Sequence, residues 1–177
     1  DAIAKAGGLP SLCQLLDDTA PEAHAIAAEA LARMARDRPA HQTPIAKKLV
    51  SLLSSHSEGT QCRAANALKD LAANNESATV RIVNAGAISP LVSVLGKGSA
   101  KANDEAVGAV SVLAKDDLNN QLAIATGLVA LLGVSEDDAK EIIHEVVARF
   151  ASAKDMHVAI HDAVRELRVI RAFRMGG

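Results

Sequence analysis

The strongest constraint on the fold of this chain is that its sequence repeats. The segment AAEALARMA (27–35) recurs 37 residues later as AANALKDLA (64–72), then 42 residues later as AVGAVSVLA (106–114), and after a further 37 residues as IHEVVARFA (143–151). Self-similarity at such a spacing is typical of a solenoid built from stacked helical units. The sequence therefore predicts a row of equivalent helical modules.

Large apolar residues stay in step through the four copies. They form two columns, the first with Leu31, Leu68, Val110 and Val147, and the second with Met34, Leu71, Leu113 and Phe150. Because the columns are three residues apart, both lie on one face of a helix. A second apolar segment ending in CQLL, VSLL, VSVL or VALL precedes each copy. We expect units at approximately 1–38, 39–75, 76–116 and 117–153, with a partial unit at 154–177.

The composition favours closely stacked helices over a β-sandwich or barrel. Of the 177 residues, 49% are hydrophobic but only 1% are aromatic, and there is neither Trp nor Tyr. A net charge of -2 offers no electrostatic attraction to nucleic acid, so we expect no nucleic-acid binding. The longest uncharged stretch, 118–135, is broken by Asn and Gly residues, and we expect no membrane span.

Cysteine usage and the first residue bear on the compartment. Two cysteines cannot form a disulfide framework and fit a reducing compartment. The chain does not begin with Met, which indicates a processed or excised piece of a longer protein. We expect an intracellular, cytoplasmic protein, or an organellar one if a leader was removed.

Two segments that each include a predicted joint between helices resemble a known repeat family. The segment IVNAGAISPLVSVL (82–95), followed by a long helix ending in AVSVLA, resembles an armadillo repeat, and so does IAKAGGLPSLCQLL (3–16) followed by AAEALARMA. The resemblance implies an all-α fold, a right-handed α-α superhelical solenoid with about four and a half repeats of a larger array. Each unit would have a short helix, a second helix and a longer third helix lining a concave groove. HEAT repeats are the nearest alternative, and the AG-A-I-x-P-L joint favours armadillo.

The same resemblance identifies the positions that would face a partner. Armadillo proteins that hold extended peptides place Asn on each third helix in the motif A-L-x-N-L-A, and often Trp one turn earlier. Here the Asn position holds Arg33, Asp70, Val112 and Arg149, and the Trp position holds Glu29, Asn66, Gly108 and Glu145. An amide both donates and accepts toward a peptide bond, whereas Arg only donates and Val does neither. The peptide-clamping residues are therefore missing.

We expect the partner-binding residues in the groove to be Glu29, Arg33, Asn66, Asp70, Val112, Glu145 and Arg149. Glu29 with Arg33, and Glu145 with Arg149, are opposite charges four residues apart. Each pair either recognises a charged partner or is an ordinary solvated intrahelical ion pair, and we favour the second interpretation. Gly108 falls inside a predicted long helix, where it indicates a close helix crossing.

Three functions are compatible with these features. The first is a non-enzymatic scaffold that binds a partner protein on the concave third-helix face. The second is a structural accessory subunit of a large, possibly organellar, protein assembly, with contacts at the ends and convex loops. The third, an import-type cargo adaptor, is disfavoured because the Asn and Trp residues are missing.

No group of residues predicts catalysis, a metal or a cofactor. His157 and His161 are four residues apart, but no third ligand is near them in the sequence. Cys13 and Cys62 are flanked by core-type residues and have no paired His that would activate a nucleophile. We therefore expect no enzyme, no catalytic residue, no metal and no cofactor.

The two ends of the chain need covering if the solenoid is open. Exposed end units of a repeat array present apolar surface. We expect neighbouring repeats or a partner subunit to cover Ile3, Leu9 and Leu12 at one end and Leu167, Ile170 and Phe173 at the other. Residues 154–177 form a basic amphipathic segment that fits either an anionic partner or membrane surface, or the second helix of a truncated fifth unit. We favour the second interpretation and expect no membrane association.

Overall fold

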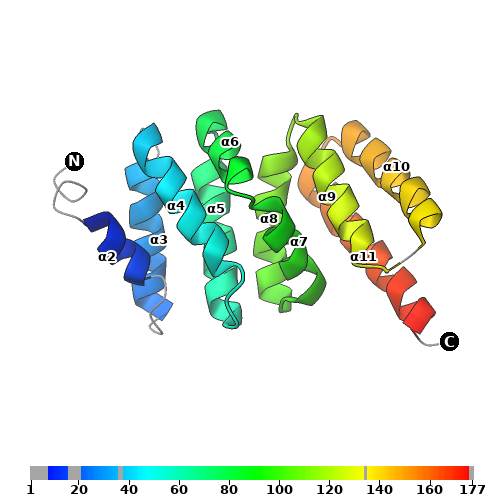
Figure 1. Cartoon of the computed structure of the whole chain (residues 1–177), viewed down its shortest axis with the longest axis horizontal. Helices are drawn as coiled ribbons and strands as arrows, with labels where there is room; N and C mark the ends of the chain where they lie inside the picture. The colour runs from blue at the N-terminus through cyan, green and yellow to red at the C-terminus, as the bar shows by residue number, and fades with distance from the viewer. Residues whose placement is uncertain (1–7, 16–20, 36–37, 134, 176–177) are drawn as a thin grey trace.

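The computed structural model describes residues 8–15, 21–35, 38–133 and 135–175, which form ten helices and no strand. The helices are α2 (Gly8–Leu15), α3 (Pro21–Ala35), α4 (Pro39–Leu52), α5 (Glu58–Ala72), α6 (Glu76–Asn84), α7 (Ile88–Lys97), α8 (Ala100–Ala114), α9 (Leu118–Ala130), α10 (Glu136–Ser152) and α11 (Met156–Met175). They follow one another along an extended array (Figure 1). The expected all-α solenoid is confirmed.

The helices form two layers. The long helices α3, α5 and α8 lie side by side in one layer, in which α5 packs against both of the others. Helices α4, α7 and α9 form the second layer, shown in front of the first in Figure 1. Helix α4 packs on α5 and α6, and α7 packs on α8 and α9. Each unit therefore contacts its neighbours in both layers.

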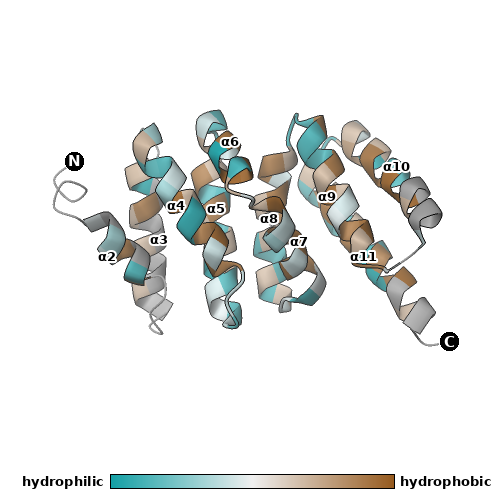
Figure 2. Cartoon of the chain, in the orientation of Figure 1, coloured by the Kyte–Doolittle hydropathy of each residue, from teal (hydrophilic) through white to brown (hydrophobic). Residues whose placement is uncertain are grey.

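The repeated apolar columns form the core between these layers. Leu31, Leu68 and Val110, the first column in α3, α5 and α8, are at most 1% exposed. Alanine surrounds them at positions such as Ala27 and Ala65, both fully buried, and a side chain this small lets neighbouring helices approach closely. Figure 2 shows brown and teal residues alternating along α4 to α7, as amphipathic helices require.

The units differ in how many helices they contain. Among the units at 39–75, 76–116 and 117–153, residues 76–116 have the three helices that the resemblance implies, because α6 and α7 meet at a bend of 77°. Gly86 lies in that joint with φ +81°, a left-handed conformation that glycine adopts without strain. In units 39–75 and 117–153 a single helix, α4 or α9, stands where two were expected.

A polar contact closes the joint between each third helix and the next unit. Seven residues after the terminal alanine of α3, α5 and α8 stands Gln42, Thr79 or Gln121. Gln42 Nε2 donates to the Ala35 carbonyl at 3.0 Å, and Gln121 Nε2 donates to the Ala114 carbonyl at 3.0 Å. The single hydroxyl proton of Thr79 is shared between the Ala72 carbonyl at 3.4 Å and the Asn75 carbonyl at 3.1 Å. Each of the helix-terminal carbonyls of Ala35, Ala72 and Ala114 also accepts a backbone N–H, from Arg38, Asn75 or Asp117. The side chains therefore supply a second donor to an oxygen that has two lone pairs. We call these three contacts the joint hydrogen bonds.

The C-terminal end departs from this regular stacking. Helix α10, expected as the third helix of unit 117–153, packs mainly against α9, and α11 packs against α8. Helix α11 was expected as a second helix, yet it extends the row of α3, α5 and α8. As a result Leu167, expected to need a partner, is buried within the chain at 6% exposure. At the other end Leu12 is half-buried, while Ile3 and the side chains of Leu9 and Phe173 lie outside the described residues.

Candidate functional site

The solvent-accessible side chains of α3, α5 and α8 form one surface, here called the third-helix face. It carries polar and charged residues from all three helices, together with the apolar Val112: Arg33, Arg63, Asn66, Asp70, Lys101 and Asp104. The opposite sides of the same helices are buried in the core. The core packing therefore fixes the spacing of the outward residues from one unit to the next.

Four of the predicted partner-binding residues lie on this face. Arg33 and Asp70 are exposed, and Asn66 and Val112 are half-buried. Asn66 Nδ2 donates to Asp70 Oδ2 at 3.4 Å, one turn along the same helix. This exposed contact leaves Asp70 Oδ1 and the Asn66 amide oxygen available to a partner. The side chain of Glu29 lies outside the described residues.

An ion pair that sequence reasoning missed joins two units across this face. Lys69 Nζ of α5 lies 2.7 Å from Glu105 Oε2 of α8, and the two side chains are 31% and 27% exposed. The stem of Lys69 crosses Gly108, where an added Cβ would lie 2.8 Å from Lys69 Cδ. The close approach at Gly108 is thus made by the Lys69 side chain of the neighbouring helix α5. The available signal was a pair of opposite charges 36 residues apart, close to the spacing of the units.

The two predicted residues of α10 lie away from the third-helix face. Arg149 Nη1 donates to Glu166 Oε2 of α11 at 2.6 Å, and Nη2 donates to Glu145 Oε1 at 3.4 Å. The hydrogen bond to Glu166 raises the pKa of Arg149 above its usual value. The predicted intrahelical pair thus exists, but its stronger contact is with α11. The physical reason is that α11 takes the place beside α8 that α10 was expected to hold.

Comparison with solved structures identifies this arrangement. An engineered protein is similar over 97% of this chain and 82% of its own length, with 26% identity and a TM-score of 0.58. A designed armadillo repeat protein in complex with the peptide (KR)4 is similar over 94% of this chain and 84% of its own, with 22% identity and a TM-score of 0.53. This chain has the armadillo repeat fold. No protein-family model matches it.

A curated relative covers part of the armadillo array. Vacuolar protein 8 of Yarrowia lipolytica (strain CLIB 122 / E 150) is 32% identical over 136 residues. The match includes 73% of this chain and 24% of the relative. The chain therefore spans about a quarter of the length of the relative that it matches.

An open cleft of about 630 Å³ lies at one edge of the third-helix face. It opens between the α5–α6 joint and the α8–α9 joint, and Val112 lines it. Glu76, Asp116 and Asp117 contribute carboxylates, and Lys115 is the cation in its lining. This edge is thus acidic, although Asp117 Oδ1 accepts a hydrogen bond from the Asn120 amide at the start of α9.

Among residues 8–15, 21–35, 38–133 and 135–175, the armadillo fold brings together no group of three His, Cys, Asp or Glu side chains that could hold a metal. His157 and His161 are both exposed on α11. In the same part of the chain, no single helix is both long and apolar enough to cross a bilayer, and one bent pair, α6 with α7, meets that criterion by length and composition.

Cys62 is buried on α5 and is expected to react slowly with thiol reagents. Burial raises the pKa of its thiol, and the nearby Glu105 carboxylate raises it further. Because the thiolate is the reactive form, the native Cys13→Ser variant should react with Ellman's reagent at least about tenfold more slowly at pH 8 than the same variant unfolded in guanidinium. Equal rates would show that the Cys62 thiol is not protected from the reagent by burial and that its pKa is not raised.

Proposed function

We propose that this armadillo chain binds another protein on its third-helix face and catalyses no reaction. The observation that carries the proposal is the row of α3, α5 and α8, whose buried sides pack together while their polar sides face solvent. Repeat proteins use such extended, rigid surfaces for association, which then costs little reorganisation. In support, a designed protein of the same fold was solved in complex with a peptide.

The side chains favour a partner that presents charged groups rather than a bare peptide backbone. The face alternates cations such as Arg63 and Lys101 with anions such as Asp70 and Asp104. The Lys69–Glu105 ion pair bridges α5 and α8, and the Lys69 stem covers Gly108. A partner side chain therefore cannot pack against Gly108. Complementary charge on a partner would set orientation and the rate of association. The residues proposed to contact it are Arg33, Asn66, Asp70 and Val112, with Glu29 on the same helix row.

The peptide (KR)4 is expected to bind this chain poorly. The three positions on the face at which a peptide-clamping amide would stand hold Arg33, Asp70 and Val112. Fluorescence anisotropy with labelled (KR)4 in about 0.15 M salt should show no saturation up to about 100 µM. The variant R33N/D70N/V112N restores donor and acceptor groups and should bind at least about tenfold more tightly. Submicromolar binding by the native chain would instead support the cargo-adaptor alternative.

Site-specific photo-crosslinking tests the proposed face. A photoreactive amino acid is placed at Asp70, on the face, and at Ser93, exposed on α7 in the other layer. Each variant is incubated with extract from the source cells, and adducts are identified by mass spectrometry. We expect a discrete protein adduct from position 70 and none from position 93. Adducts from position 93 alone would contradict the proposal.

One observation favours the accessory-subunit alternative. Val80 and Leu122 stand 42 residues apart at equivalent positions of α6 and α9 and are 53% and 48% exposed. A partner seated on these first helices would leave the third-helix face free. A crosslinker at position 122 distinguishes the two functions, because only the accessory subunit would form adducts there. With Cys62 a free thiol, either function fits a reducing, intracellular compartment.

A further inference from the structure

The fourth copy of the repeat is buried differently from the other three. The last residue of every copy is alanine. Ala35, Ala72 and Ala114 are at most 2% exposed, whereas Ala151 of α10 is exposed. Val147, in the column of the buried Leu31 and Leu68, is only half-buried. Helix α10 thus carries the residues of a third helix but leaves part of that apolar face uncovered.

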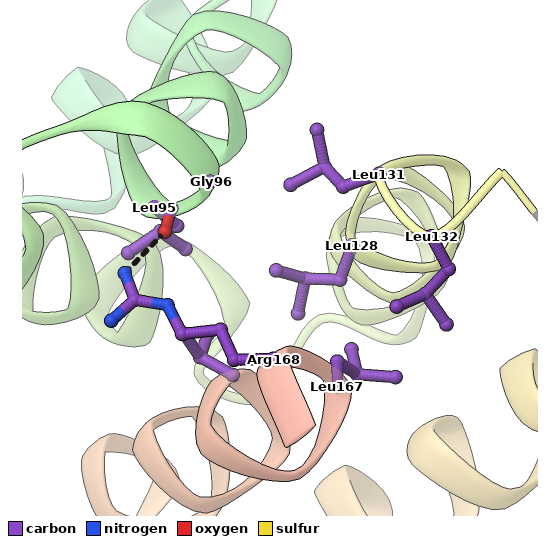
Figure 3. A pocket seen from close by; sticks show the side chains of 8 residues that line it. Leu95, Gly96, Leu128, Leu131, Leu132, Leu167 and Arg168 are labelled. Atoms are coloured by element: carbon purple, nitrogen blue, oxygen red, sulfur yellow. Dashed lines mark hydrogen bonds between the residues drawn. The ribbon is translucent and has the colours of Figure 1, made fainter. Parts of the chain in front are cut away.

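Helix α11 occupies the flank of α8 instead. It buries Ile160, Ala163 and Leu167, and Arg168 Nη2 donates to the Leu95 carbonyl at 2.7 Å (Figure 3). That carbonyl lies in the last turn of α7, where carbonyls lack an intrahelical donor. Because Arg168 is late in α11 while Leu95 lies just before α8 begins, α11 runs antiparallel to α8. Near them Leu128, Leu131 and Leu167 line a notch of about 30 Å³.

The joint between α10 and α11 lacks the contact that fixes the earlier joints. Val158 stands seven residues after Ala151. This is the position that Gln42, Thr79 or Gln121, which makes the joint hydrogen bond, holds in the earlier joints. Valine cannot donate to the Ala151 carbonyl, and Val158 is 52% exposed. Consequently position 158 does not supply the side-chain donor that the amide or hydroxyl supplies at the earlier joints, and the Arg149–Glu166 ion pair links α10 to α11 instead.

We propose that the flank of α8 is a docking site with two occupants from this chain: α11, as the structure shows, and α10, as the repeated columns specify. Exchange of α11 for α10 would cover Ala151 and Val147 and bring Arg149 into line with Asp70 and Val112. It would break the Arg168–Leu95 hydrogen bond and the Arg149–Glu166 ion pair. It would also take Ile160, Ala163 and Leu167 out of their present packing. The third-helix face would then gain a fourth equivalent helix. The exchange does not depend on what the face binds.

The test restores the missing joint hydrogen bond. The variant V158Q/R168A supplies a side-chain amide at the fourth joint and removes the Arg168 donor. Its matched control is V169Q/R168A, because Val169 is 51% exposed on the same helix and is not seven residues from a helix-terminal alanine. With Cys13 and Cys62 replaced by alanine, spin labels are placed at the exposed positions 101 and 148 to follow α8 and α10, and at 101 and 161 to follow α8 and α11.

Pulsed electron resonance distances then report which helix lies beside α8. We expect V158Q/R168A to show a shorter 101–148 distance population about fivefold larger relative to the control, the size that one hydrogen bond gives. The 101–161 pair should lose a matching share of its native distance. Identical distributions in the two variants, or a displaced α11 without approach of α10, would overturn the proposal. Circular dichroism of both variants verifies that they are helical.

Discussion

Replacing Gln42 by leucine is expected to lower the free energy of unfolding by about 3 kcal/mol. Gln42 is 2% exposed, and its amide nitrogen donates to the Ala35 carbonyl. Its Oε1 also accepts from Arg81 Nε at 3.0 Å and Ser77 Oγ at 3.2 Å, which ties unit 39–75 to the next. Leucine fills similar space but removes these three hydrogen bonds, each of which contributes about 1 kcal/mol. Urea denaturation followed by circular dichroism measures the change.

Two further variants test this explanation. Gln14 is exposed on α2, so Gln14→Leu should change the stability by less than about 0.5 kcal/mol. Gln121 makes the same joint hydrogen bond, but its Oε1 is buried with no hydrogen-bond partner, so Gln121→Leu should cost about a third as much as Gln42→Leu. Equal losses for Gln42 and Gln121 would mean that the bonds to Arg81 and Ser77 contribute nothing.

Truncating Phe150 to alanine is expected to be the most damaging single change, at about 3–5 kcal/mol. Phe150 is 1% exposed and is the largest of the fully buried side chains. Its loss removes buried area and leaves a cavity beneath α10, which the surrounding helices fill only in part. The measurement is the midpoint of urea denaturation together with its slope.

A surface truncation of similar type provides the control. Leu122 on α9 is 48% exposed, and Leu122→Ala should shift the stability by less than about 0.5 kcal/mol. Phe150→Leu should fall between the two variants. If Phe150→Ala proved no worse than Leu122→Ala, α10 would not be packed as the structure shows.

The sequence was sufficient to predict the solenoid because its determinants are local and repeated. A column such as Leu31, Leu68 and Val110 has one environment in every regular unit, so one pattern specifies many contacts. The same periodicity correctly identified α3, α5 and α8. It also identified the helix row on which Asn66 and Asp70 lie.

The position of α10 could not be predicted in this way, because it depends on competition between distant segments. The columns through Val147 and Ala151 predict a third helix, and nothing in that segment alone shows that α11 binds α8 more favourably. Arg168 reaches a carbonyl 73 residues earlier in the chain, a contact that no local pattern indicates. Among the site residues, the Lys69–Glu105 pair could not be predicted from the repeat, because it joins non-equivalent positions of two units.

The constant seven-residue interval at the joints has a consequence for how such arrays change in length. The third and second units differ by five residues, 42 against 37 in repeat spacing, yet the interval from Ala35 to Gln42 equals that from Ala114 to Gln121. The extra residues lie between Ile82 and Leu95, where the two helices α6 and α7, joined by a bend at Gly86, replace a single helix. Insertions and deletions can therefore accumulate inside a module without disturbing the linkage that sets its orientation to the preceding one.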